Sequence, residues 1–438
     1  MMRISIAPRR LIAAGLILAA PVLIAPLAWA EGGKPLTLSA ALAAADAGNP
    51  DTRMAEADRD AALAERDIAS SRTDTTLNFN GILRSGAQKP NMENFLPDNS
   101  VQLIARKTLY DFGRSSAAEE AAGYEVSARE SEMVTAKERH RLDVMARFFD
   151  VLMADMQYTA DNEIMSIRYV TFDHGRDNLA AGKISAVELS ELESRFQDAL
   201  LKRNASQQQQ RITRALLANA MNHPGELPED LEDPKLESNN RKLPEYTVLL
   251  PEMLANNPRI RAQQELLVAS QKRIDSYKAD RRPTLDAEVQ ASDFSRPALT
   301  RDNVSAGLIL NWPIWQGIRN DSRIAREYAL SNKSQAALDK LKMDMTQSFL
   351  ETYLQIEQLQ TVGRSSAQKR VEQNDLVLER SRGLYEMELR SDLGTSMADT
   401  VEAGLRARRN EYQLALAFAR LEAMMGKPLV AEMIKKKQ

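Results

Sequence analysis

The chain has 438 residues, with 58 Lys and Arg against 61 Asp and Glu, no cysteine and only 3 histidines. The lack of cysteine excludes disulfides, cysteine-ligated metals and thiol nucleophiles, and the near balance of charge argues against a nucleic-acid-binding protein, which would be basic. Aromatic residues make up 5% and hydrophobic residues 43% of the chain, a composition typical of long helices packed through Ala and Leu.

No chemical motif predicts catalysis. The sequence contains no nucleophile elbow, no Gly-rich phosphate loop and no H-E-x-x-H pattern. The three histidines, His140, His174 and His223, are isolated from one another. We therefore expect no enzyme activity, no catalytic residue, no cofactor and no metal site.

Residues 1–30 have the three parts of a secretory signal peptide. The basic part consists of Arg3, Arg9 and Arg10. An apolar run over 11–24 follows, and Ala28 and Ala30 form an A-x-A cleavage site. A membrane anchor is the alternative, but Pro21 interrupts a run that is already short. No later segment reaches the roughly 20 consecutive apolar residues of a transmembrane helix, so any later membrane crossing must use strands.

The rest of the chain repeats one order of elements. Asn49-Pro50 opens the first series and Asn257-Pro258 the second, and a nearly constant offset then pairs Gly113 with Gly317. An ordered series of such matches indicates duplication. We predict two structural repeats, 31–240 and 241–438, each with a helix, a β-hairpin, a long helix and a shorter helix, joined by a Pro- and Glu-rich linker over 222–244.

Each repeat contains two segments in which apolar and polar residues alternate, as in strands. In the first repeat they lie near 77–84 and 101–105, separated by a polar loop over 88–99; in the second they lie near 285–292 and 304–312. Each is about ten residues long, the length of a tilted transmembrane strand. A soluble, half-buried hairpin is the alternative for either pair taken alone.

The helical segments are expected to be long. No proline interrupts 115–178, which as one helix would extend about 96 Å. A tip at Gly182 leads to a returning helix over about 185–220, and a further helical stretch over about 39–71 precedes the strands. Four strands cannot close a membrane barrel, and open edges cannot face lipid. Several chains must therefore share a barrel, as a dimer, a trimer or a larger ring.

These features together resemble the TolC-type outer-membrane efflux proteins. The resemblance rests on the duplicated Asn-Pro starts, the strand-exit turns 109–113 and 313–317, and the helix tips near Gly182 and Arg390. It implies a mainly α fold with a small β part, in which long coiled-coil helices form an α-barrel. Four strands per chain would contribute to a 12-stranded β-barrel of a homotrimer.

The resemblance also implies a function and a location. The protein would be the exit duct of a tripartite efflux or type I secretion system in the outer membrane of a Gram-negative bacterium, with a large periplasmic portion. It would be a passive conduit in contact with outer-membrane lipid, opened by a periplasmic adaptor and an inner-membrane transporter. The alternative is a periplasmic coiled-coil adaptor or structural protein without a membrane barrel. The cargo and the partner pump are not identified by the sequence.

The resemblance further implies a gate at the periplasmic tip. Tyr385 and Arg390 have the spacing of the family's gate residues, and Glu188 lies where the family has their acidic partner. An ordinary exposed ion pair is the alternative interpretation. The family's channel-lining aspartates correspond here to other residue types, Gly394 and Met397. Asp392 and Asp399 are the candidates to replace them.

Overall fold

The computed structural model describes residues 35–45, 48–87, 95–296, 301–387 and 393–428. The chain divides into two compact units, Met1–Pro35 and Leu36–Gln438, and every helix and strand below belongs to the second. The predicted cleavage residues Ala28 and Ala30 lie outside the described residues.

The first half contains helices on both sides of a pair of strands. Its elements are α1 (Leu38–Ala45), α2 (Pro50–Ser70), η1 (Ser71–Thr73), β1 (Thr76–Ile82), β2 (Ser85–Gly86), β3 (Leu96–Pro97), β4 (Ser100–Tyr110), α3 (Arg114–Ala180) and α4 (Ala186–Ala220). The helix expected over 39–71 is two helices, because Pro50 begins a new one. The paired strands β2 and β3, within the predicted loop, were not expected.

The second half repeats this order after a short 3-10 turn. Its elements are η2 (Glu237–Asn240), α5 (Tyr246–Asn256), α6 (Pro258–Ala279), β5 (Thr284–Phe294), β6 (Val304–Asn311), α7 (Arg319–Gln358), the π-helical turn η3 (Leu359–Gly363), α8 (Arg364–Glu386) and α9 (Leu393–Met425). The long helix of this half is thus continuous over 319–386 but contains one π turn.

The duplicated Asn-Pro pairs are helix starts. The side chain of Asn49 accepts a hydrogen bond from the backbone N–H of Asp51, and that of Asn257 accepts from Arg259 and Ile260. In both cases proline follows as the first helical residue, where its missing N–H costs nothing. The same local chemistry therefore begins α2 and α6.

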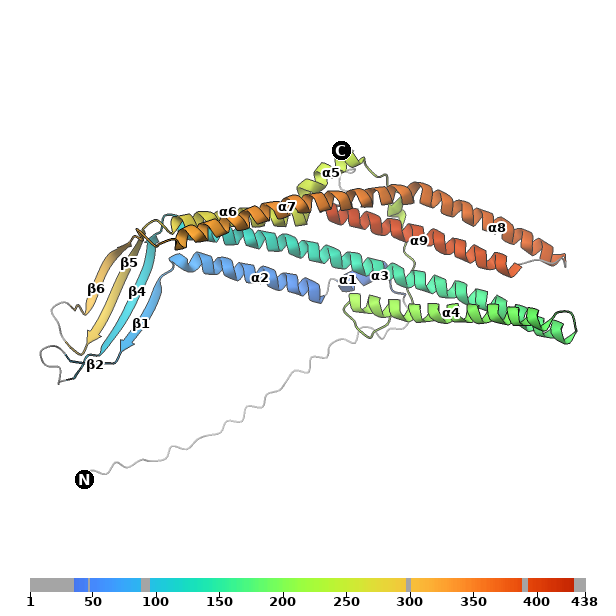
Figure 1. Ribbon diagram of the computed structural model, residues 1–438, viewed down its shortest axis with the longest axis horizontal. Coiled ribbons are helices and arrows are strands. Elements are labelled where there is room, and N and C mark those ends of the chain that lie inside the picture. Colours follow the sequence, from blue (N-terminus) through green and yellow to red (C-terminus); the bar gives the residue numbers. More distant parts are fainter. Residues whose placement is uncertain (1–34, 46–47, 88–94, 297–300, 388–392, 429–438) are drawn as a thin grey trace, which may run out of the picture. The chain divides into compact units, whose positions relative to one another are not determined.

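The four main strands form one antiparallel sheet in the order β1-β4-β5-β6. The central pair, β4 and β5, joins the two halves of the chain. The helices α2, α3, α6 and α7 continue from these strands, and each packs on the next in the same order. Figure 1 shows the sheet at one end and the helices leading away from it. The result is a wall one layer thick.

The longest helix, α3, has 67 residues and so extends about 100 Å. It ends in a left-handed Gly182, whose backbone N–H donates to the carbonyl of Leu179. The α4 helix then returns along it. Close to this tip, a Cβ on Gly175 would lie 2.6 Å from Leu192 Cδ1, so a larger residue there would require the Leu192 side chain of α4 to shift.

Two hydrophobic clusters hold the helices together, and α9 belongs to both. One contains Phe148 and Leu217 from α3 and α4, and it receives Tyr412 from α9. The other gathers α5, α6 and α7, and it receives Leu414 and Phe418 from α9. Because α9 places one face in each cluster, it joins the two halves of the chain.

The π turn lies where the linker crosses the helices. The side chain of Gln360 donates to the backbone carbonyls of Asn239 and Arg241, and Asn410 of α9 donates to the carbonyl of Leu359. A Cβ on Gly363 would lie 2.3 Å from Asn410 Oδ1. The widened turn and the missing side chain make room for Asn410.

Candidate functional site

The sheet has one polar face and one apolar face, and the apolar face is the more exposed. Antiparallel register places Arg106 opposite Glu288, and Leu103 opposite Ala291, so like side chains share a face. In β5, Val289 on the apolar face is 52% exposed, whereas Ser292 on the polar face is 8% exposed. A soluble protein would place its aliphatic face in the core.

Polar residues on the other face are paired across β4 and β5. The guanidinium of Arg106 donates from Nε to Glu288 Oε2 at 2.8 Å, and the hydroxyl of Thr108 donates to Asp286 Oδ1 at 2.7 Å. These bonds join the two halves of the chain. They also satisfy charged groups that would be costly beside an apolar medium.

The exposed apolar surface extends to both edges of the sheet. On β1, Phe79 is 70% exposed, and on β6, Leu308 is 67% exposed. In the described part of the chain, no further strand pairs with the outer edge of either β1 or β6. The exposed aromatic residues Tyr110, Trp312 and Trp315 follow where the sheet meets the helices. Aromatic side chains at the end of an apolar band are typical of a membrane–water interface.

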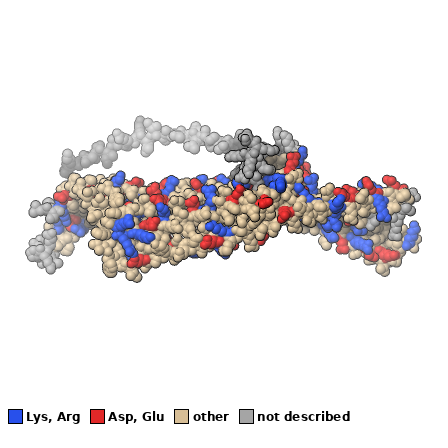
Figure 2. Space-filling model, turned by 90° about the horizontal axis from the view of Figure 1, so that it is seen from above, with Lys and Arg blue, Asp and Glu red and all other residues tan. Residues whose placement is uncertain are grey.

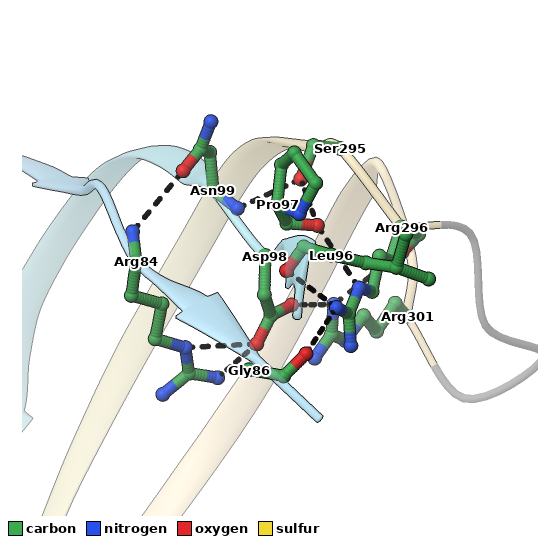
Figure 3. Close-up of polar contacts among 9 residues, drawn as sticks. All are labelled: Arg84, Gly86, Leu96, Pro97, Asp98, Asn99, Ser295, Arg296 and Arg301. Carbon is green, nitrogen blue, oxygen red and sulfur yellow. Dashed lines mark hydrogen bonds and ion pairs between the residues drawn. The ribbon is translucent and has the colours of Figure 1, made fainter. Parts of the chain in front are cut away.

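At the opposite end of the sheet, the loops of the two halves are bound together. Asp98, which precedes β4, accepts from Arg84 Nε at 2.8 Å and from Arg301 Nη1 at 3.3 Å (Figure 3). The hydrogen bond from Arg84, assisted by that from Arg301, holds the pKa of the Asp98 carboxyl below its usual value. The carboxylate therefore stays charged between the two guanidinium groups.

A second arginine in this cluster binds backbone carbonyls. Arg296 donates to the carbonyls of Gly86, Leu96 and Pro97, which belong to the β2–β3 ribbon (Figure 3). Beside it, Ser295 Oγ accepts from the backbone N–H of Asn99 at 2.7 Å. We call the nine residues drawn in Figure 3 the outer loop cluster: Arg84, Gly86, Leu96, Pro97, Asp98, Asn99, Ser295, Arg296 and Arg301. It fixes the β5 end to the loop between β1 and β4.

Of the predicted gate residues, the structure describes Glu188, in the first turn of α4, and Tyr385, near the end of α8. Glu188 closes a capping box with Ser185, accepting from its backbone N–H at 2.7 Å and its hydroxyl at 3.0 Å. These hydrogen bonds lower the pKa of Glu188. Tyr385 is near the end of α8 and is 65% exposed. Arg390 lies outside the described residues, so the gate pair stays a prediction.

The replacement acidic residues are likewise only partly described. Asp399 is an exposed residue of α9, and its backbone carbonyl accepts from Asn374 Nδ2 at 2.7 Å. Asp392 lies outside the described residues. At Gly394, a Cβ would be 2.6 Å from Ile167 Cγ2 of α3. An acidic side chain at that position would therefore collide with α3.

The described residues contain neither a metal-ligand cluster nor a large single-sign patch on the face seen from above. No group of three His, Asp or Glu side chains among them could hold a metal ion. Lys, Arg, Asp and Glu are interspersed along the face drawn in Figure 2. Among the described helices, none combines the length and the apolar character needed to cross a membrane.

The model of the outer membrane efflux protein family matches residues 41–223 and 249–427, one stretch in each half of the chain. The chain belongs to the outer membrane efflux protein family. No curated protein sequence matches it significantly. Its fold is nevertheless similar to those of several solved outer membrane channels.

Three of these structures cover most of the chain. The outer membrane protein VceC from Vibrio cholerae is 15% identical, with a TM-score of 0.72 over 89% of this chain and 96% of its own. The Campylobacter jejuni CmeC outer membrane channel is 13% identical, with a TM-score of 0.74 over 91% and 89%. The open state of the Neisseria gonorrhoeae MtrE outer membrane channel is 18% identical, with a TM-score of 0.73 over 90% and 89%.

For this family member, the mainly α fold with a small sheet is therefore confirmed. Sequence reasoning missed the outer loop cluster, whose basic and acidic residues come from loops about 200 positions apart, such as Asp98 and Arg301. The excess of Arg and Asp at the ends of the predicted strands was the available signal. The charges alone do not predict which Arg binds which Asp, because the register of β4 against β5 decides which loop residues meet.

Proposed function

We propose that the chain is the exit duct of an efflux or secretion system in the outer membrane. The observation that carries this proposal is the sheet whose aliphatic face is exposed and whose charged face is paired, continued by helices of about 100 Å. Lipid suits the aliphatic face and water the charged one. Family membership supports the same function. The protein would be a passive conduit without catalytic chemistry.

The free edges of β1 and β6 support assembly. Each carries unpaired backbone groups beside exposed aliphatic side chains, and these groups need partners in a membrane. Pairing of β1 from one chain with β6 of the next would satisfy both edges. Three chains would then form a 12-stranded barrel, and their helices a periplasmic tunnel. A homotrimer in the outer membrane of a Gram-negative bacterium is the assembly we propose.

The partners we propose are a periplasmic adaptor and an inner-membrane transporter, which would supply the energy. We further propose that residues 1–30 are a signal peptide cleaved after Ala30, and that 31–240 and 241–438 are the two repeats. Drug efflux and type I secretion both remain within this proposal, because selectivity would reside in the transporter.

Fractionation tests the proposal directly. Full-length protein expressed in a Gram-negative host should appear in the outer-membrane fraction and migrate as a trimer on unheated gels. Heating should convert the trimer to a monomer. A soluble periplasmic protein, with or without assembly, would contradict the proposal and favour the alternative of an adaptor or structural protein.

We also propose that Glu188, Tyr385 and Arg390 form a gate at the helix tip. Glu188 is in the first turn of α4 and Tyr385 is near the end of α8, and Figure 1 shows these two helix ends away from the sheet. The spacing of Tyr385 and Arg390 in the sequence also supports the proposal. Asp392 and Asp399 would contribute acidic side chains to the same end. A gate held by a charge-assisted pair can be released by a modest movement.

Single-channel conductance in planar bilayers tests the gate. Glu188→Gln removes the charge and still permits a capping box, which accepts Glu or Gln at this position. It should therefore raise conductance without disturbing α4, and Glu188→Lys should raise it at least as much. Glu193→Lys, an exposed change on the same helix, is the control. Equal conductance in the wild-type protein, both Glu188 variants and Glu193→Lys would refute the gate.

A further inference from the structure

A cavity of about 470 Å³ lies where the sheet passes into the helices, and four arginines line it. They are Arg114, Arg282, Arg319 and Arg323. They come from the start of α3, the turn between α6 and β5, and the start of α7. Asp280 is the acidic residue among the lining side chains. Arginine remains charged at any physiological pH, so the cavity lining is strongly positive.

These arginines have few partners within the protein, and Arg282, Arg319 and Arg323 are exposed to solvent. Arg114 Nη1 lies 3.7 Å from Asp280 Oδ1, and Arg282 Nη1 donates to the backbone carbonyl of Phe112 at 3.2 Å. Within the described ranges, the side chains of Arg319 and Arg323 make neither an ion pair nor a hydrogen bond to the protein. By contrast, the neighbouring Arg281 pairs with Asp321. One carboxylate thus faces four guanidinium groups.

The positions of three of these arginines are electrostatically unfavourable. Arg114 and Arg319 are the first residues of α3 and α7, where the helix dipole disfavours a cation. Arg323 follows Arg319 by four residues on α7, so the two like charges repel each other across one helical turn. An anion in the cavity would relieve both effects.

The cavity adjoins the polar face of the sheet. Thr284 and Asn311 line it, and they are register partners at the end of β5 and β6. They share a face with Asp286 and Glu288, opposite the exposed aliphatic residues. The cavity therefore lies at the boundary between the sheet and the helices.

We propose that this arginine cavity binds an oxyanion of the phosphate class. The guanidinium fork matches the paired oxygens of a phosphate group, which it can bind through two parallel hydrogen bonds. The phosphate group belongs either to an anionic solute in the aqueous space or to a phospholipid headgroup. This site does not depend on transport, so it can be tested in the isolated protein.

Tryptophan fluorescence reports on the cavity. The chain has 3 tryptophans, of which Trp29 lies in the predicted signal peptide. The other two, Trp312 and Trp315, adjoin the lining residues Pro313 and Gln316. Full-length protein purified in detergent is titrated with pyrophosphate, and a parallel titration uses potassium chloride at matched ionic strength. We expect a saturable change in emission with pyrophosphate alone.

Paired variants locate the response. Arg319→Gln with Arg323→Gln should weaken pyrophosphate binding by about tenfold or more, because two charge-assisted contacts are lost. Lys333→Gln with Lys340→Gln removes the same charge from α7 outside this cavity and should leave binding unchanged. Equal binding in both double variants, or a response to chloride equal to that of pyrophosphate, would overturn the proposal.

Reconstitution separates the two sources of phosphate. The protein is placed in nanodiscs of phosphatidylcholine alone, or of phosphatidylcholine and phosphatidylglycerol in equal parts. Loss of the pyrophosphate response in the anionic discs identifies a lipid headgroup as the ligand. An unchanged response identifies an aqueous anion. In either case the Arg319 and Arg323 double variant must bind more weakly than the wild-type protein, or the site is refuted.

Discussion

Phe149 of α3 and Tyr412 of α9 stack with their ring centroids 4.6 Å apart and an interplanar angle of 9°. The hydroxyl of Tyr412 also donates to Asp233 Oδ1 in the linker at 2.9 Å. One aromatic side chain therefore connects the first half, the second half and the segment between them. Burial, followed by the hydrogen bond to Asp233, raises the pKa of Tyr412.

Tyr412→Phe should keep the stacking and lose the hydrogen bond, at a cost of about 1–2 kcal/mol in the free energy of unfolding. Because the pKa of Tyr412 is raised, its contribution to the free energy of unfolding should depend on pH. The stability that the neutral phenol contributes is present below the unfolded pKa of about 10 and is lost as pH rises beyond it. Thermal unfolding followed by circular dichroism should therefore show a smaller alkaline loss in the variant. Parallel losses in both proteins would contradict this assignment.

Arg364 and Glu411 form a bidentate pair between α8 and α9, with N–O distances of 2.7 and 2.8 Å. The hydrogen bond from Arg364 is the main cause that lowers the pKa of Glu411. Glu411→Gln should lower the free energy of unfolding by about 2 kcal/mol at neutral pH, as for a partly buried charged hydrogen bond. Glu402→Gln, at an exposed pair on the same helix, should cost under about 0.5 kcal/mol.

The same pair predicts an acid effect. Because the folded pKa of Glu411 lies below its unfolded value of about 4.3, the stabilisation is present above that pH and is lost as pH falls through the folded pKa. Urea unfolding measured over the acid range should show a steeper loss in the wild-type protein than in Glu411→Gln. Identical slopes would show that this pair does not govern the acid response.

The effect of Gly363→Ala on the free energy of unfolding should change sign when Asn410 is also replaced by alanine. Gly363→Ala forces the Asn410 side chain away from the π turn, and overpacking of this kind costs about 1–3 kcal/mol. In an Asn410→Ala background the obstacle is gone, and alanine should instead stabilise the helix by about 0.5–1 kcal/mol over glycine. The four proteins form a double-mutant cycle measured by thermal unfolding. Additive effects would refute the contact.

Arg296→Ala should release the β2–β3 ribbon from the outer loop cluster. Three carbonyl hydrogen bonds are lost, so amide hydrogen exchange over 95–99 should accelerate by about tenfold or more. Arg301→Ala is the matched comparison, because Asp98 retains Arg84 and the ribbon keeps Arg296; exchange there should change little. Equal acceleration in the two variants would show that charge, and not the carbonyl contacts, holds the loops.

Much of the fold could be predicted from local patterns. The Asn-Pro pairs at Asn49 and Asn257 carry their own capping chemistry, and the proline-free stretch 115–178 lies within α3. Alternation of apolar and polar residues predicted β5 and β6 closely. The helix expected over 39–71 disregarded Gly48, Asn49 and Pro50, residue types that end one helix and begin the next. The π turn was missed because none of the residues 359–363 requires it. The side chain of Asn410 on α9 does require the space that the turn provides.

The sites depended more on tertiary contacts. The partners of Arg296 are backbone carbonyls, which no side-chain pattern records. The arginine cavity combines Arg114 with Arg319, and their proximity follows from the order of the helices in the wall. Glu188 was predicted to bind Arg390, which lies outside the described residues, so that pair stays a prediction. The described contact of Glu188 is with Ser185 in the capping box of α4.

The π turn at 359–363 inserts one extra residue into a helix that otherwise runs without interruption over 319–386. Each residue rotates the side-chain positions of an α-helix by about 100°, so the stripe that α7 turns toward α6 does not continue onto α8. The α9 helix, which already contacts α7, also packs on α8 beyond the turn. A single insertion thus acts as a phase change: α8 presents a different row of side chains to α9 than an uninterrupted α-helix would.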